Sequence, residues 1–408
     1  MLEIVALLAL IIVLGYFSEI LFDKTNVPDI FILLLLGLAL GPLGVSQSLP
    51  GLATLTPGFL APLASLVAVL TLVVILFDAG LDVNLQELLK SAPFAFKGTV
   101  INFFFTTATC FAALFLAGWD WLHALIVAVL IADTAEEVVF SLLQKVKVRP
   151  WVKSLLIFEG AFTSTLIGIF TVLIVSVFVQ AGSSGPVTLD NLGSSFLGSI
   201  SIALVLGAGV SYLWVQMLVT KRISSHRYLL SLAMAMILYV VVEAFHAHGV
   251  IAVLIFGVAL GLSKEKLEKS LFEFHREITF LVRSFFFVYL GFIISFDNLS
   301  ISAITVSLLA VGAMLAGRLV GLQYIAKAQS PTKPEFVLLA GALPAGLATA
   351  VFATVLQRYG VVIPGLSEFI FLVIFESVLL SMICTFYYAR NQPSFDVKKP
   401  VIVSKTPG

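Results

Sequence analysis

Three carboxylates stand close together inside an otherwise apolar stretch of the chain, at Asp133, Glu136 and Glu137. Their spacing of i, i+3 and i+4 would gather them on one face of a continuous helix. A charged side chain near the centre of a bilayer costs on the order of 3 kcal/mol on insertion scales. Three such charges are tolerated only where they face a cavity, bind cations or carry protons. The pattern therefore predicts an ion-binding site.

The composition of the chain places this cluster in a membrane. Of its 408 residues, 60% are hydrophobic and 11% are charged, and the mean hydropathy is +1.12. Apolar runs recur from residue 2 to residue 389, which predicts an all-α polytopic membrane protein with no separate soluble domain. The formal net charge of +0 excludes a basic patch suited to nucleic acid.

About 13 apolar spans are long enough to cross a hydrocarbon core of roughly 30 Å. They lie near residues 2–22, 28–46, 58–79, 93–118, 121–143, 152–180, 191–219, 226–246, 248–263, 277–296, 300–326, 335–357 and 364–389. If the N-terminus is outside, the even-numbered connections hold only Arg358, and the odd-numbered ones and the tail hold nearly all other basic residues. Because Lys and Arg concentrate in cytoplasmic loops, we predict an external N-terminus and a cytoplasmic C-terminus in the plasma membrane.

Short similarities between distant spans suggest an internal repeat. Ile157-Phe-Glu-Gly160 in the sixth span resembles Ile374-Phe-Glu-Ser377 in the thirteenth, and Asp133-Thr-Ala135 in the fifth resembles Ala348-Thr-Ala350 in the twelfth. The members of each pair stand seven spans apart, and an odd separation gives them opposite orientations. We therefore predict two inverted six-helix repeats with interrupted helices 5 and 12, whose freed backbone groups line an ion site near the midplane.

Several segments resemble the monovalent cation:proton antiporters, the family of sodium/proton and potassium/proton exchangers. These segments are Lys24-Thr-Asn-Val-Pro-Asp-Ile-Phe-Ile32, Gly37-Leu-Ala-Leu-Gly-Pro42, Phe77-Asp-Ala-Gly-Leu81, Ser284-Phe-Phe-Phe-Val-Tyr-Leu-Gly291 and Leu343-Pro-Ala-Gly-Leu-Ala348. Their order agrees with the family over residues 5–388. The resemblance implies a membrane domain over residues 1–390, followed by a short tail, 391–408. Within it we expect a scaffold that also forms a homodimer face (1–79 and 226–296), a linker span (191–219) and a mobile core (93–180 and 300–389).

The resemblance also assigns roles to individual residues, with one departure. The unwound fifth span of the family falls on Ala132-Asp-Thr-Ala-Glu-Glu137, and the sixth-span Glu falls on Glu159. Four residues later, where the family normally has its cation-binding aspartate, this chain reads Thr163-Ser164. Arg318 matches the basic residue that pairs with the sixth-span Glu, so Glu159 and Arg318 are expected to form a structural ion pair.

The missing aspartate leads to a hypothesis of relocation. Ser164 cannot exchange a proton at physiological pH, whereas the carboxylates of the fifth span can do so as one coupled set. A dehydrated sodium or potassium ion would be bound by carboxylates, hydroxyls and freed backbone carbonyls. The predicted cation and proton site comprises Asp133, Thr134, Glu136, Glu137, Glu159, Thr163 and Ser164.

The sequence thus predicts antiport of a monovalent cation, with sodium favoured, against protons by alternating access. One alternative is a potassium/proton antiporter or potassium efflux module with a separate regulatory subunit, since residues 391–408 contain no Gly-rich βαβ pattern. Another is a transport-dead sensor or assembly subunit. No Ser/His/Asp constellation, P-loop or metal-ligand spacing occurs, so we expect no enzyme activity, metal or cofactor. The expected partners are Na⁺ or K⁺, protons, the lipid bilayer and a second copy of the chain.

Overall fold

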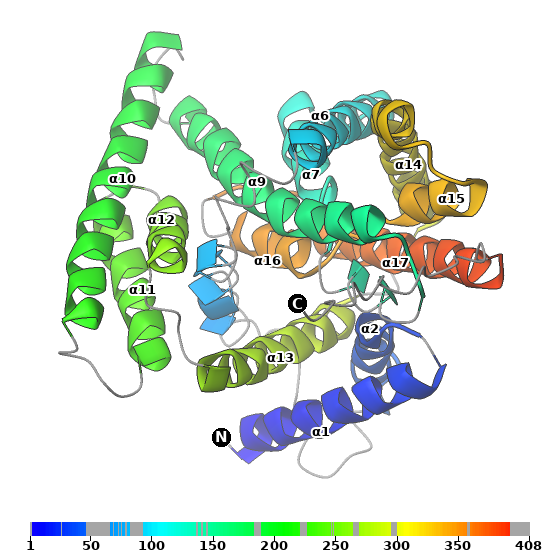
Figure 1. Cartoon of the computed structure of the whole chain (residues 1–408), viewed down its shortest axis with the longest axis horizontal. Helices are drawn as coiled ribbons and strands as arrows, with labels where there is room; N and C mark the ends of the chain where they lie inside the picture. The colour runs from blue at the N-terminus through cyan, green and yellow to red at the C-terminus, as the bar shows by residue number, and fades with distance from the viewer. Residues whose placement is uncertain are drawn as a thin grey trace, which may run out of the picture.

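The computed structural model describes residues 2–25, 27–45, 66–67, 69–71, 73–74, 76–77, 80–81, 93–135, 138–139, 142–143, 146–182, 189–220, 227–245, 247, 249–263, 269–294, 300–356 and 360–391. Every longer regular element in these residues is an α-helix (Figure 1). The helices are α1 (Leu2–Thr25), α2 (Asp29–Leu40), α6 (Pro93–Leu116), α7 (Trp121–Ile131), α9 (Pro150–Gly182), α10 (Leu189–Val219), α11 (Arg227–Ala244), α12 (Gly249–Leu262), α13 (Lys269–Phe292), α14 (Ile301–Gln329), α15 (Lys333–Gly341), α16 (Leu347–Leu356) and α17 (Leu366–Arg390).

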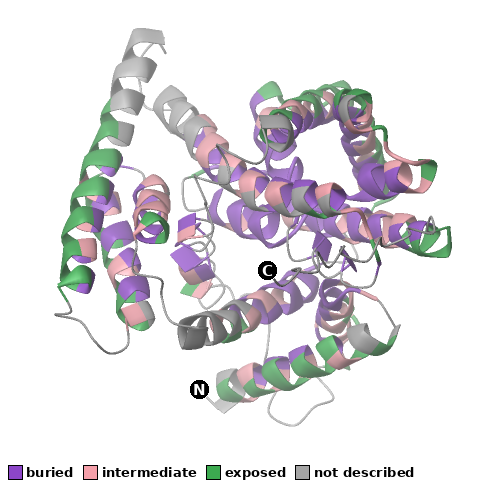
Figure 2. Cartoon of the chain, in the orientation of Figure 1, coloured by how far each residue is buried: buried purple, intermediate pink, exposed green. Residues whose placement is uncertain are grey.

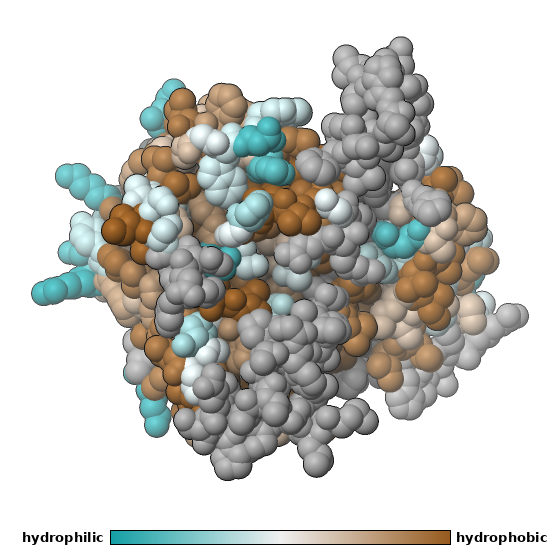
Figure 3. All heavy atoms as spheres, turned by 180° about the vertical axis from the view of Figure 1, so that it is seen from behind, coloured by the Kyte–Doolittle hydropathy of each residue, from teal (hydrophilic) through white to brown (hydrophobic). Residues whose placement is uncertain are grey.

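Among the described residues, five helices are long and apolar enough to cross a membrane, and they lie in α6, α9, α10, α14 and α17. Large hydrophobic side chains such as Tyr16 on α1 and Val205 and Tyr212 on α10 are exposed. Figure 2 shows such exposed residues along the outer sides of α1 and α10, and Figure 3 shows broad hydrophobic areas on the opposite face of the molecule. A surface of this kind is suited to lipid rather than to water.

The helices form three groups of neighbours (Figure 1). In the first, α6 packs against α7, α9 and α14, while α17 packs against α14, α15 and α16. In the second, α1, α2 and α13 contact one another, and in the third α10, α11 and α12 do so. The short helix α16 also contacts α7, α9 and α13, and therefore lies between the first two groups.

Two glycines allow α2 and α13 to approach closely. A Cβ added to Gly37 would lie 2.2 Å from the carbonyl oxygen of Val288, and one added to Gly291 would lie 2.4 Å from that of Leu34. Both obstacles are backbone atoms, which cannot turn aside as a flexible side chain would. Small residues at such crossings are the usual means of close packing between membrane helices. Both glycines belong to segments that carry the family resemblance.

Arg283 of α13 adds a polar link to the same group of helices. Its guanidinium lies 2.7 Å from a carboxylate oxygen of Asp29 on α2 and 3.4 Å from one of Glu19 on α1. The Asp29 side chain is buried, so the pair is more than a surface contact. Arg283 therefore joins the three helices of this group.

Local capping explains where several helices begin. Asp120 accepts hydrogen bonds from the backbone N–H groups of Leu122 and His123, so α7 starts directly after it. Ser300 caps α14 in the same way through the N–H of Ala303. These caps separate helices that the hydropathy pattern alone leaves nearly continuous.

The helical and apolar character predicted from the sequence is confirmed for the described residues. The apolar part of α13, Phe280–Phe292, lies inside the predicted span 277–296. The helix itself starts earlier, at Lys269, because polar residues can extend a helix beyond the hydrocarbon layer. The predicted span 58–79 falls mostly outside the described residues. The count of about 13 spans and the two inverted repeats stay predictions.

Candidate ion site at two interrupted helices

Two helices stop within the apolar interior of the protein. Helix α7 ends at Ile131, residues 132–135 are not helical, and helical residues reappear at Val138 and Val139. Helix α15 ends at Gly341, and α16 starts at Leu347 after five non-helical residues, 342–346. The interruptions predicted for the fifth and twelfth spans are therefore present in the structure.

The two interruptions contact each other through hydrogen bonds. The N–H of Ala135 donates to the carbonyl oxygen of Pro344 at 2.7 Å. The hydroxyl of Thr349 donates to the carbonyl oxygen of Leu130 at 2.8 Å. The N–H of Ala345 donates to Oγ of Ser377 on α17 at 3.0 Å. Backbone groups freed by a helix break need such partners within a membrane, so these bonds fix the two breaks against each other.

Asp133 lies at this contact and is only 2% exposed. Its Oδ1 accepts hydrogen bonds from the hydroxyls of Thr163 at 3.3 Å and Ser164 at 3.2 Å, both on α9. Its Oδ2 lies 3.5 Å from the hydroxyl of Thr349 on α16. These distances exceed the usual 2.7–2.8 Å or so of an O–H···O bond, so the hydroxyls are only weakly bonded to the carboxylate.

The α9 hydroxyls have a second acceptor, which explains their weak hold on Asp133. The carbonyl oxygen of Gly160 lies 3.3 Å from Oγ1 of Thr163 and 3.2 Å from Oγ of Ser164. Each hydroxyl has one hydrogen but two lone pairs, so its oxygen remains available as a ligand when the hydrogen points to Gly160. One carboxylate and three hydroxyl oxygens thus converge, and oxygen ligands of this kind suit hard cations.

A buried ion pair joins α9 to α14. Its acid, Glu159, lies one helical turn before Thr163 on α9. Nη1 of Arg318 on α14 lies 2.7 Å from Oε1 of Glu159, and Nη2 lies 3.0 Å from Oε2. Both residues are 2% exposed. Nε of Arg318 donates to the carbonyl oxygen of Leu339 on α15, and Nδ2 of Asn102 on α6 donates to Glu159. Arg318 and Glu159 are thus joined by two parallel charge-assisted hydrogen bonds. Together with the bonds to Leu339 and Asn102, they connect α6, α9, α14 and α15.

The structure brings together some of the predicted site residues and separates others. Asp133, Thr163 and Ser164 meet as expected, whereas Thr134 contributes its backbone N–H to Thr163 at 3.2 Å. Glu159 has both carboxylate oxygens engaged with Arg318. Glu136 and Glu137 lie outside the described residues.

Sequence reasoning missed Thr349, Asn102 and Ser377 as members of the site and its surroundings. For Thr349 a signal existed, because Ala348-Thr-Ala350 was recognised as the counterpart of Asp133-Thr-Ala135 in the other half of the chain. Asn102 is a single amide within an apolar span. It could have been suspected on that ground alone, but nothing in the sequence connects it to Glu159.

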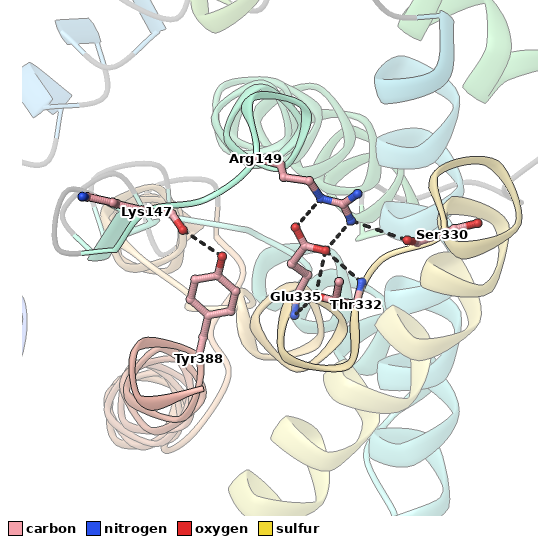
Figure 4. Close-up of polar contacts among 6 residues, drawn as sticks. All are labelled: Lys147, Arg149, Ser330, Thr332, Glu335 and Tyr388. Atoms are coloured by element: carbon pink, nitrogen blue, oxygen red, sulfur yellow. Dashed lines mark hydrogen bonds and ion pairs between the residues drawn. The ribbon is translucent and has the colours of Figure 1, made fainter. Parts of the chain in front are cut away.

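A second polar cluster joins the chain before α9 to the start of α15 (Figure 4). Nε and Nη2 of Arg149 donate to the carboxylate of Glu335, which lies in the first turn of α15. The backbone N–H and the hydroxyl of Thr332 donate to Oε2 of Glu335 at 2.8 and 2.9 Å, which completes a capping box. The side chain of Glu335 is 0% exposed and that of Arg149 is 30% exposed.

The donors around Glu335 control its charge. Burial by itself would raise the pKa of this carboxyl above its ordinary value. The hydrogen bonds from Arg149 and Thr332 and the charge of Arg149 outweigh burial and hold the pKa below that value. Glu335 is therefore ionised at neutral pH.

Nearby, the hydroxyl of Tyr388 on α17 donates to the carbonyl oxygen of Lys147 at 2.8 Å (Figure 4).

Fold and site together define a polytopic membrane protein with a carboxylate site between two interrupted helices. The sequence model of the family described as "Sodium/hydrogen exchanger, transmembrane" matches residues 7–388. The chain belongs to this family of multi-pass membrane proteins, and the resemblance seen in the sequence to monovalent cation:proton antiporters is confirmed.

Individual relatives agree with this assignment. The chain is 23% identical over 298 residues to the K(+)/H(+) antiporter NhaP of Alkalimonas amylolytica, an alignment that covers 71% of this chain and 49% of that protein. The match thus spans about half the length of that curated relative.

Two solved structures of the sodium proton antiporter MjNhaP1 of Methanocaldococcus jannaschii share the fold. The structure at pH 8 has a TM-score of 0.70 and 22% identity and covers 95% of this chain and 96% of its own. A second, from an electron-microscopy map, has a TM-score of 0.68 and 20% identity and covers 98% and 100%.

Proposed function

We propose that this chain exchanges a monovalent cation for protons by alternating access and that Asp133 is the centre of its ion site. The observation that supports this most strongly is the position of Asp133. It is a buried carboxylate at the contact of two interrupted helices, with hydroxyls from α9 and α16 around it. Ion sites of secondary transporters are commonly built in this way, from broken helices that cross near the midplane.

The exchange follows from the cost of a buried charge. An ionised Asp133 is unfavourable in a low-dielectric interior unless a cation neutralises it, and a protonated Asp133 no longer attracts a cation. Cation and proton therefore compete for one carboxylate. If each is exchanged with both sides of the membrane as the protein changes conformation, the two fluxes are coupled.

The fifth-span carboxylates complete the proposed site. Ser164 stands where related sequences have an aspartate and supplies only a hydroxyl, at 3.2 Å from Asp133. We assign to Glu136 and Glu137 the proton binding that Ser164 cannot provide; they follow Asp133 by three and four residues in the sequence. Thr134, Thr163 and freed backbone carbonyls would add oxygen ligands. Glu159 keeps a structural role in its pair with Arg318.

The division into a moving core and a scaffold is part of the same proposal. The contacts of α6, α7 and α9 with α14, α15 and α16, and those of α17 with the same three helices, support a core over 93–180 and 300–389. The contacts among α1, α2 and α13 support a scaffold over 1–79 and 226–296 that also forms a homodimer face. In this arrangement α10 is the linker. The distribution of Lys and Arg supports an external N-terminus and a cytoplasmic C-terminus in the plasma membrane.

Sodium is the favoured cation. Two solved structures that share the fold are of a sodium proton antiporter. Potassium/proton exchange is the second candidate, since the curated relative is named as a K(+)/H(+) antiporter.

Transport by the purified protein in liposomes tests the proposal. With a pH-sensitive dye inside, addition of Na⁺ or K⁺ outside is expected to change the internal pH for the unaltered protein, and Asp133→Asn is expected to abolish this change. Glu277→Gln, which removes an exposed carboxylate of α13, is the matched control and should keep full activity. Absence of any cation-dependent pH change in the unaltered protein would overturn the proposal.

A further inference from the structure

A second carboxyl group lies within the helix core, outside the proposed ion site. Glu376 of α17 has its Oε1 2.8 Å from the hydroxyl oxygen of Ser307 on α14. Its Oε2 atom is buried and has no hydrogen-bond partner among the described residues. Glu376 takes no part in the proposed exchange, so the structure leaves a half-buried titratable group to be explained.

The hydrogen bonds of Ser307 indicate whether the carboxyl group of Glu376 is protonated. The hydroxyl of Ser307 has one hydrogen, yet two acceptors lie within reach, Oε1 of Glu376 and the carbonyl oxygen of Ile304 at 2.9 Å. An ionised Glu376 can only accept, so one of the two contacts would lack a hydrogen. If Glu376 carries a proton, it donates to Ser307, and Ser307 donates to Ile304. Both contacts are then ordinary hydrogen bonds.

The charged groups on the neighbouring helices do not offset an ionised Glu376. Helix α17 packs against α2, α13, α14, α15 and α16, and α16 contains no charged residue. The titratable and charged residues of the others, and of α17 itself, are Asp29, Lys269, Glu273, His275, Arg276, Glu277, Arg283, Tyr289, Arg318, Tyr324, Lys327, Lys333, Glu335, Glu368, Cys384, Tyr387, Tyr388 and Arg390. In the described part of the chain, Ser307 is the only polar partner of Glu376.

Two arginines on neighbouring helices, one on α14 and one on α13, are already paired with other carboxylates. Arg318 binds Glu159 at 2.7 Å, and Arg283 binds Asp29 at 2.7 Å. Neither shares a hydrogen bond or an ion pair with Glu376. A carboxylate buried without a cation loses hydration that nothing replaces, which favours the neutral acid.

We propose that Glu376 is a second proton-binding group of this chain, which keeps its proton in the contact between α14 and α17 at neutral pH and releases it to water at alkaline pH. The proton is separate from the one exchanged at Asp133. Its release puts a negative charge between α14 and α17, where Ser307 alone provides a hydrogen bond.

The position of Glu376 connects its proton to the ion site. The next residue, Ser377, accepts the hydrogen bond from Ala345 in the second interruption at 3.0 Å. On the other side of the contact, α14 carries Arg318 of the buried ion pair. A charge on Glu376 would therefore disturb the helix that holds the interruption in place. This effect on transport rests on the proposed function, whereas proton binding by Glu376 does not.

Infrared spectroscopy of the protein in liposomes tests proton binding directly. The unaltered protein is expected to show the carbonyl band of a neutral carboxylic acid at neutral pH that disappears at alkaline pH. Glu376→Gln should lose this component, and Ser307→Ala should shift it, because the acid loses its hydrogen-bond partner. A spectrum that is unchanged in both variants would overturn the proposal.

The pH profile of exchange tests the connection to transport. Glu376→Gln fixes the neutral state, so its activity is expected to persist to higher pH than that of the unaltered protein, while the control Glu277→Gln keeps the original profile. Loss of the band without any change in the profile would overturn the connection. If the unaltered protein exchanges no cation at all, the proposed function fails, and the infrared result still decides whether Glu376 binds the proton.

Discussion

At the scale of single residues, the candidate site has hydroxyls where the resemblance to the antiporter family predicts an aspartate. Thr163 and Ser164 present these hydroxyls to Asp133. One buried carboxylate remains there among the described residues. If Glu136 and Glu137 supply the missing titrating group, the chain has moved its proton chemistry from the sixth span to the fifth.

This relocation predicts the effect of neutralising both glutamates. The double variant Glu136→Gln/Glu137→Gln is expected to lose most sodium- or potassium-driven proton exchange, because its fifth span keeps only one of three carboxylates. Proton flux in everted vesicles measures this. Glu277→Gln serves again as the control, and full activity in the double variant would rule out the relocation.

Thr349 should contribute to cation affinity through its hydroxyl. Thr349→Val leaves the carbonyl oxygen of Leu130 without its bond at 2.8 Å and removes one oxygen beside Asp133. The lost oxygen ligand weakens only the cation-bound state, and about 1.4 kcal/mol corresponds to a tenfold change in affinity, so we expect KM for the cation to rise by roughly tenfold. Thr349→Ser keeps the hydroxyl and should restore most of the affinity. Equal KM values for the Val and Ser variants would contradict this role.

The charged residues of the site could be found from the sequence, and the family resemblance also pointed to Thr163 and Ser164, but other neutral residues were missed. Asp133, Glu159 and Arg318 stand out because a charge within an apolar span is costly and needs a reason. Asn102 and Thr349 give no such signal, since neutral polar residues are common in membrane helices. Their roles depend on which helices meet, and that is decided by tertiary packing.

At the scale of helices, close contact between α2 and α13 requires glycine. Gly291→Ala would place a Cβ 2.4 Å from the carbonyl oxygen of Leu34. We expect the two helices to be pushed apart at a cost of about 1–3 kcal/mol, as for other overpacked sites, with a lower Tm in detergent. Gly312→Ala is the matched control, because its Cβ would meet nothing within 4 Å. An unchanged Tm for Gly291→Ala would show that the crossing can relax.

The link between Arg149 and Glu335 should make stability depend on acid pH. Because the folded protein holds the pKa of Glu335 below the ordinary 4.5, the ionised group stabilises the fold above pH 4.5. This contribution is lost as pH falls through the lower, folded-state pKa. Glu335→Gln should therefore reduce the free energy of unfolding at neutral pH by up to about 3 kcal/mol, since its partner Arg149 is 30% exposed, and so lower Tm.

The same variant should differ less from the unaltered protein at acid pH, where neither has the charge. Arg149→Lys is expected to lie between the two at neutral pH, since a lysine keeps the charge but not the paired donors. Thermal unfolding across pH measures the effect. A constant difference in Tm between the unaltered protein and Glu335→Gln at all pH values would contradict it.

The sequence predicted most helices well and some of their ends poorly. Apolar length indicated the spans, and the run of breakers from Gly341 to Gly346 indicated the second interruption. Helix α13 starts at Lys269, before the predicted apolar span 277–296, because hydropathy marks the part of a helix that lies in the membrane and not its full length. How closely two helices approach each other, as α2 and α13 do at Gly291, depends on segments far apart in the chain.

At the scale of the whole molecule, alternating access requires the core to move against the scaffold. Among the contacts that cross this proposed boundary, the ring of Phe31 on α2 stacks on that of Phe375 on α17, with centroids 4.5 Å apart. A stack of this kind is worth about 0.5–1.5 kcal/mol beyond its buried area, so it favours one arrangement without preventing the other. Thr109 of α6 and Ala313 of α14 instead contact each other within the core, at 2.8 Å.

Cross-linking these two pairs tests the motion. In a background with Cys110 and Cys384 replaced by alanine, Phe31→Cys/Phe375→Cys joined by a short bifunctional thiol reagent is expected to stop exchange. Thr109→Cys/Ala313→Cys, joined within the core, is expected to retain it. Both pairs are read in the same liposome assay before and after the reagent. Full exchange by the protein joined between α2 and α17 would mean that these helices do not separate during the cycle, and the boundary between core and scaffold would have to lie elsewhere.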